Sequence, residues 1–168
     1  MPYVDKLTSE DQSELQGLIQ VFLAEKRFEG CAGLEITDEI RLTIAAQACV
    51  LLLHRETDFY PKLQSILVYP HAYVATGRHR DDEHIVTEGP EARLGESSAR
   101  VLGEEYTALL DDLKHHRRTL IDSYGATNPA EFFAVVTELF FEKPHQLKER
   151  HPALYEQLRG FYQQDPAR

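Results

Sequence analysis

The chain has 168 residues, of which 42% are hydrophobic and 27% charged, a balance typical of a single soluble globular domain and not of disordered or fibrous proteins. The net charge of −10 argues against nucleic-acid binding, which depends on clustered Lys and Arg. Cys31 and Cys49 form no CxxC pair, which excludes a disulfide framework and a four-cysteine zinc site and suits a reducing cytosol.

The N-terminus shows no secretory or membrane-anchoring signal. Met-Pro-Tyr-Val-Asp-Lys lacks a basic segment followed by an apolar stretch, and the longest apolar run, residues 48–53, is too short to span a bilayer. We therefore expect a cytoplasmic protein that binds neither membranes nor nucleic acid.

The first 55 residues predict two helices. The pattern Ser9-x-x-Gln12 indicates a capping box at the start of the first helix. The second helix is expected to begin at Thr37, where Asp38 and Glu39 favour the positive end of the helix dipole. Its predicted buried stripe consists of Ile40, Ile44, Ala48, Leu51 and Leu52.

Beyond Pro61 the apolar spacing changes from helical to β-like. Residues 65–69 and 72–75 predict two strands, and the polar residues 77–95 predict a loop or an edge hairpin. The helical period returns at Ala99, and a further helix is expected to open at Asn128. The expected fold is therefore α+β, mostly helical with a small sheet, in one domain spanning residues 1–168.

One motif carries a family resemblance. The run Tyr124-Gly-Ala-Thr-Asn128-Pro-Ala-Glu131-Phe-Phe, continuing to Phe141, closely resembles the C-terminal signature of the Mlc titration factor A family of bacterial cytosolic zinc metallopeptidases. The resemblance implies a zincin-type peptidase domain, with Glu131 as the third zinc ligand and Tyr124 as a catalytic hydrogen-bond donor near the substrate carbonyl. It also covers residues 33–53, 65–74, 95–97 and 151–166.

The chain departs from this family at the metal site. The family's other two ligands and its catalytic Glu belong to a His-Glu-x-x-His helix, but no two of the eight histidines here are four residues apart and none precedes a Glu. The motif Gly95-Glu96-Ser97-Ser98 runs directly into Ala99. In the family, a strand and the metal-binding helix follow this motif, so the resemblance implies an internal deletion near residues 98–99.

Each candidate residue also has a structural interpretation. Glu131 stands three residues after a helix-capping Asn128, where Glu usually serves the cap, and Tyr124 alone would be a half-buried packing residue. His115 and His116 point about 100° apart on a helix, which makes them poor joint metal ligands even with Glu131 nearby. His79 and His84 could bind a divalent ion weakly, although a solvent-exposed loop fits them better. Core packing explains the aromatic residues Phe132, Phe133, Phe140 and Phe141.

Two functions remain open. The first is a pseudo-enzyme of the zinc metallopeptidase family that binds no zinc tightly and keeps a protein-binding role, for which the resemblance implies a transcriptional repressor of sugar transport as a partner. The alternative is an active zinc-dependent, aminopeptidase-type hydrolase of short peptides, if the natural protein contains the missing segment. In a true deletion, the helices at Thr37 and Asn128 should expose apolar surface.

Overall fold

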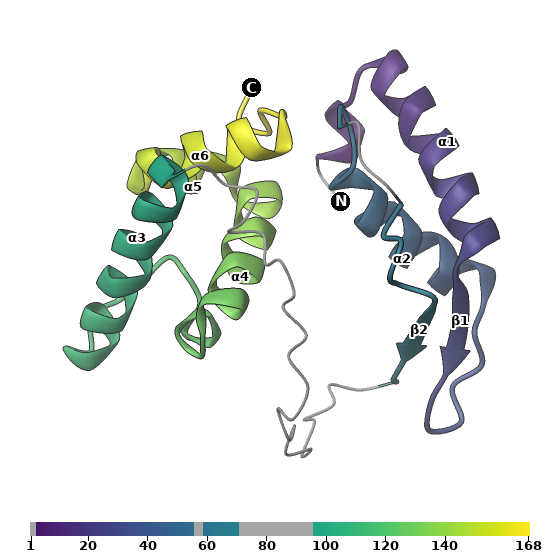
Figure 1. The fold of residues 1–168 in the computed structure, drawn as a ribbon, viewed down its shortest axis with the longest axis horizontal. Coiled ribbons are helices and arrows are strands. Elements are labelled where there is room, and N and C mark those ends of the chain that lie inside the picture. Colours follow the sequence, from purple (N-terminus) through teal and green to yellow (C-terminus); the bar gives the residue numbers. More distant parts are fainter. Residues whose placement is uncertain (1–2, 56–58, 71–95) are drawn as a thin grey trace. The chain divides into compact units, whose positions relative to one another are not determined.

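The computed structural model of the protein describes residues 3–55, 59–70 and 96–168. The chain forms two compact units, one of residues Leu7–His84, the N-terminal unit, and one of Met1–Lys6 and Ile85–Arg168, the C-terminal unit. Figure 1 shows mostly helices and one small parallel sheet, which confirms the α+β fold class. The assignment of residues 1–168 to a single domain stays a prediction.

The N-terminal unit pairs two helices with the sheet. Helices α1 (Ser9–Glu25) and α2 (Asp38–Val50) pack side by side (Figure 1). Strands β1 (Arg27–Gly30) and β2 (Ser65–Val68) run parallel. The strand predicted at residues 65–69 is confirmed, whereas β1 was not foreseen. The predictions for residues 72–75 and 77–95 lie outside the described residues.

The helix caps decide where both helices begin. The capping box of α1 consists of Thr8 and Asp11: the Thr8 hydroxyl accepts the Asp11 N–H at 3.2 Å, and the Asp11 carboxylate accepts the Thr8 N–H at 3.3 Å. The predicted Ser9 and Gln12 box is therefore wrong by one residue. Thr37 caps α2 as predicted, through the Ile40 N–H at 3.2 Å.

The buried face of α2 lies beside the predicted stripe. Ala45 and Cys49, one turn apart, are completely buried, and so is Val50. Leu52 is buried as predicted, but the other four members of the stripe are only half-buried. Leu42 is 52% exposed, which agrees with the expectation of apolar exposure on this helix.

The C-terminal unit is entirely helical in its described part. Its elements are the 3-10 helices η1 (Val4–Lys6) and η3 (Ser123–Ala126) and the helices α3 (Glu96–Lys114), α4 (Pro129–Glu142), α5 (Pro144–Arg150) and α6 (Pro152–Tyr162). Helix α4 contacts α3, η3, α5 and α6. This coverage leaves no large apolar side chain of α4 exposed, so the predicted exposure on the helix at Asn128 is wrong.

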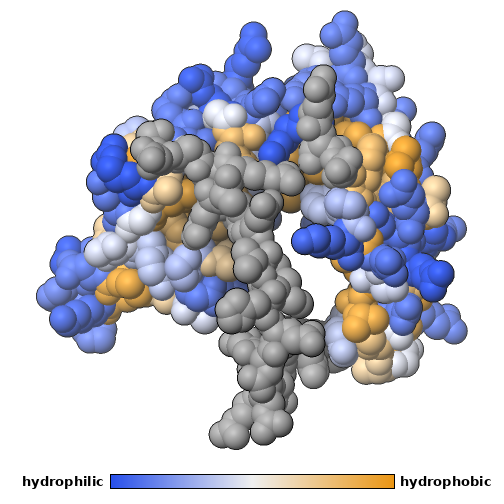
Figure 2. Space-filling view, in the orientation of Figure 1, coloured by the Kyte–Doolittle hydropathy of each residue, from blue (hydrophilic) through white to orange (hydrophobic). Residues whose placement is uncertain are grey.

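Aromatic side chains form the centre of this unit. Phe140 is completely buried, and its ring centroid lies 5.0 to 5.8 Å from those of Phe141, Tyr155 and Tyr162. Phe132 and Phe141 are also buried and Phe133 is half-buried, which confirms core packing for the aromatic run. On the face in view, Figure 2 shows apolar patches among mainly hydrophilic side chains. Among the described helices, none has the length and apolar character needed to cross a membrane.

Candidate functional site

Two consecutive helix caps position Tyr124 and Glu131. The Asp122 carboxylate accepts the Tyr124 N–H at 2.8 Å and begins η3. The Asn128 side chain then accepts the Glu131 N–H at 2.9 Å and begins α4, with Pro129 at the first helical position. Because both turns are fixed by side-chain caps, the six residues between Tyr124 and Glu131 fold back and bring the two side chains together.

The phenol and the carboxylate interact directly. The negative charge of Glu131, and then a hydrogen bond between the two side chains, raise the pKa of Tyr124, so the phenol stays protonated and donates. Within α4 and its cap, no bond from the Glu131 carboxylate to the Asn128 N–H completes a capping box. The Glu131 carboxylate therefore acts on Tyr124, while the Glu131 N–H is the group bound by the Asn128 cap. Tyr124 is 58% exposed, which corrects its interpretation as a half-buried packing residue.

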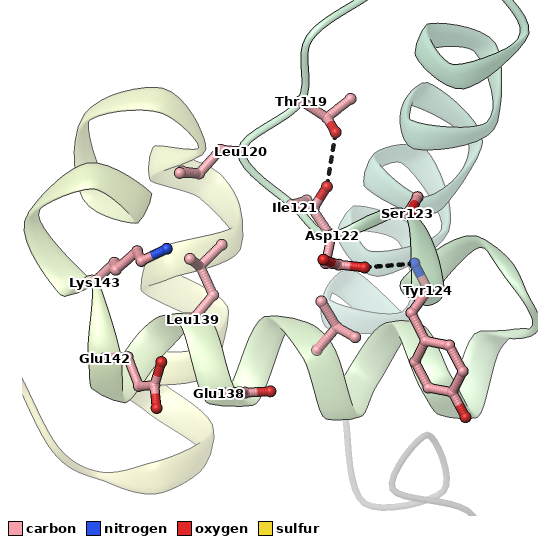
Figure 3. Close-up of a pocket in the computed structure, with 11 residues that line it drawn as sticks. Thr119, Leu120, Ile121, Asp122, Ser123, Tyr124, Glu138, Leu139, Glu142 and Lys143 are labelled. Carbon is pink, nitrogen blue, oxygen red and sulfur yellow. Dashed lines mark hydrogen bonds between the residues drawn. The ribbon is translucent and has the colours of Figure 1, made fainter. Parts of the chain in front are cut away.

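An open groove of about 460 Å³ lies beside Tyr124 (Figure 3). Residues 119–124 form one wall and one face of α4 forms the other. Along α4, Glu131, Val135, Glu138 and Glu142 follow one another at spacings of four, three and four residues, which places them on one helix face. Val135, Glu138 and Glu142 line the groove, and Glu131 lies on the same helix face one turn before Val135.

The surroundings of Glu131 do not fit a catalytic zinc. Such a site needs three protein ligands. In the described ranges, the group of three suitable side chains close enough to share an ion is Asp11, Glu14 and His54, and it does not include Glu131. His115 contacts the backbone oxygen of Asp111 at 2.8 Å. His79 and His84 lie outside the described residues.

The Asp11, Glu14 and His54 group was not predicted from the sequence. Its possible ligand atoms lie within 4.8 Å of one another. Asp11 already caps α1, and Glu14 accepts the His54 N–H at 3.1 Å. The three-residue spacing of Asp11 and Glu14 indicates that the two acids share a helix face, but no sequence pattern places them next to a histidine forty residues later. Partly exposed acids with structural partners of this kind are common without a metal ion.

The predicted deletion point lies inside a regular helix. Helix α3 begins at Glu96, three residues before the predicted start, and continues through the Ser98–Ala99 bond. The Ser98 hydroxyl donates a hydrogen bond to Gln157 of α6, and Val101 and Leu102 are buried just beyond. The chain therefore passes through this point without a break in secondary structure.

The metallopeptidase character of the C-terminal signature agrees with the comparisons with known proteins. The profile of the family described as Glucose-regulated metallo-peptidase M90 matches residues 1–102 and 98–163. The chain belongs to this family.

Named relatives cover nearly the whole chain. A protein of Synechocystis named "Uncharacterized protein slr2042" is 34% identical over 223 residues, which is 99% of this chain and 81% of the relative. Mlc titration factor A of Salmonella arizonae is 25% identical over 99% of this chain and 89% of its own length. The protein of the same name from Salmonella paratyphi B is also 25% identical, with 84% of its length covered.

The alignments are longer than the chain itself. They run over 223 positions while the chain has 168 residues, so at least 55 positions lie opposite gaps in this chain. The two family matches meet and overlap at residues 98–102. The internal deletion expected near residues 98–99 stays a prediction.

Proposed function

We propose that this chain is a non-hydrolytic member of the M90 family that binds a peptide segment of another protein through its C-terminal unit. The observation that carries the proposal is that the two family matches overlap at residues 98–102, in a sequence that contains no His-Glu-x-x-His motif. Tyr124 and Glu131 are both retained, C-terminal to that overlap.

The chemistry left at the site supports binding. A single carboxylate supplies one of the three ligands that a catalytic zinc requires, and the described residues provide no others beside it. The single phenolic proton of Tyr124 is already donated to Glu131, but the exposed Tyr124 oxygen and the Glu131 carboxylate can each accept a hydrogen bond from a peptide N–H group. Two such groups beside a groove are suited to recognising a polypeptide backbone.

The relatives suggest the class of partner. Two of them are named Mlc titration factor A, a name that refers to the titration of Mlc. We extend that role to this chain and propose a transcriptional repressor as the partner, in the cytoplasm. The retained pair also favours a second candidate, an active zinc aminopeptidase, in a natural protein that carries the missing segment.

Metal content and hydrolysis separate the two candidates. We expect no stoichiometric zinc after dialysis against zinc-containing and then zinc-free buffer, and no hydrolysis of amino-acid anilides above that of Glu131→Gln. Glu149→Gln, an exposed acid on α5, is the matched control. One tightly bound zinc per chain, with activity that Glu131→Gln abolishes and Glu149→Gln keeps, would overturn the non-hydrolytic assignment.

Calorimetric titration with purified Mlc tests the partner. We expect measurable binding that Tyr124→Phe and Glu131→Gln both weaken and Glu149→Gln leaves unchanged. An absence of binding to the unaltered chain, or equal affinity for all three variants, would contradict a repressor-binding role for this site.

A further inference from the structure

We propose that the groove beside α4 is a subsite for a Lys or Arg side chain of the bound peptide. This inference rests on the proposed peptide-binding function and adds a specificity to it. The groove is the 460 Å³ hollow between residues 119–124 and α4 (Figure 3).

The groove combines an apolar floor with an acidic rim. Ile121 and Leu139 are buried, and Val135 is half-buried. The rim carries the exposed carboxylates of Asp122, Glu138 and Glu142. Because Lys and Arg have an aliphatic stem and a charged head, they can lay the stem on such a floor and place the head among the carboxylates.

The groove carries a net negative charge even when its own cation is counted. Lys143 is the one cation among the lining residues, against three carboxylates. Glu138 and Glu142 form no ion pair with any described residue, so both are available to a ligand. Asp122 contributes less, since one of its oxygens already accepts the Tyr124 N–H. A cationic side chain is therefore favoured over a neutral or anionic one of similar size.

The spacing along α4 fixes the register of the peptide. Glu131 and Glu138 are seven residues apart, which corresponds to about 10 Å along a helix that rises 1.5 Å per residue. An extended peptide advances about 3.3 Å per residue. The basic residue is therefore expected about three positions from the residue that contacts Tyr124 and Glu131.

NMR titration of the ¹⁵N-labelled chain tests this subsite. The probes are two capped alanine hexapeptides, one with a single Lys and one with norleucine, its uncharged analogue, at the same position. We expect the Lys peptide to bind about fivefold more tightly and to shift the amide signals of Glu138 and Glu142, as for two exposed charge contacts. The preference should shrink at high salt.

The matched variants isolate the acidic rim. Glu138→Gln combined with Glu142→Gln should reduce the Lys preference to less than about twofold, while Glu10→Gln combined with Glu149→Gln should keep it. All four acids are exposed, and none has an ion pair with a described residue.

The outcomes distinguish the subsite from the proposed function. Equal affinity for the Lys and norleucine peptides, or a Lys preference that survives the groove variant, overturns the basic subsite alone. If neither peptide binds, the proposed peptide-binding function fails and the subsite fails with it. Cleavage of both peptides with a retained Lys preference overturns only the non-hydrolytic assignment.

Discussion

Replacing Tyr155 by Phe tests how the end of the chain is attached to the C-terminal unit. Tyr155 is completely buried. Its hydroxyl donates a hydrogen bond to the Asp165 carboxylate at 2.6 Å and accepts the Ala167 N–H at 3.0 Å. Tyr155→Phe keeps the ring in place and removes both bonds, so the measured loss reports on the hydroxyl alone.

The expected loss is about 2 to 3 kcal/mol at neutral pH, because a hydrogen bond to a charged acceptor contributes about 1.5 to 3 kcal/mol and the second bond is neutral. The hydrogen bond from Tyr155 is the largest cause that lowers the pKa of Asp165, ahead of opposing burial and of attraction to Lys148 and Arg159. A lowered carboxyl pKa stabilises the fold above the unfolded-state pKa, and this contribution is lost as the pH falls through the folded-state pKa. The deficit of the variant should therefore be largest at neutral pH and shrink in acid.

Urea unfolding followed by circular dichroism at pH 7 and pH 3 measures this deficit. Tyr106→Phe is the control, since the Tyr106 hydroxyl donates to the Ala126 backbone oxygen at 3.3 Å, an acceptor that does not titrate. It should cost about 1 kcal/mol at both pH values. A Tyr155→Phe deficit below about 0.5 kcal/mol at pH 7, or one of equal size at both pH values, would refute the reasoning.

Two further predictions concern a cap and a thiol. Asn128→Ala should lower the free energy of unfolding by about 1 kcal/mol, because it removes the acceptor for the Glu131 N–H. Asn128→Asp keeps an acceptor and should retain most of that stability. Equal urea midpoints for the two variants would contradict the cap. In the native protein at pH 8, Cys49 should resist a thiol reagent that modifies Cys31, because burial raises the pKa of Cys49 to about 11. Cys31→Ser should therefore remove the fast-reacting thiol. Rapid modification of Cys49 would contradict its burial.

Local rules predicted the helix starts well where the cap is unambiguous. Thr37 and Asn128 are each followed by a strongly periodic apolar segment, and both cap their helices. At the start of α1, Thr8 and Ser9 are adjacent and both suited to capping, so the sequence pattern alone could not choose between them. The choice falls on Thr8 because Asp11, and not Gln12, completes the reciprocal bond.

Tertiary features were harder to predict. Strand β1 has a single large apolar residue, Phe28, and owes its conformation to pairing with β2, a partner 38 residues later in the chain. The family resemblance singled out Tyr124 and Glu131, as a catalytic donor and a zinc ligand, but their contact with each other was not predicted. The acidic rim was readable in the sequence, since Glu138 and Glu142 follow Glu131 at helical spacing, but only the opposite wall at residues 119–124 turns that helix face into a groove.

The continuity of α3 across Ser98 and Ala99 sets a condition on any longer family member that would carry an insertion at this point. A segment of at least 55 residues inserted here would form a loop whose two ends must stay one residue apart. Closing an unstructured loop of that length costs about 3.5 kcal/mol from the logarithmic length dependence alone. The inserted segment must therefore gain more than this by packing against the rest of the protein. This chain needs no such contacts here, because helix α3 passes through Ser98 and Ala99 without interruption.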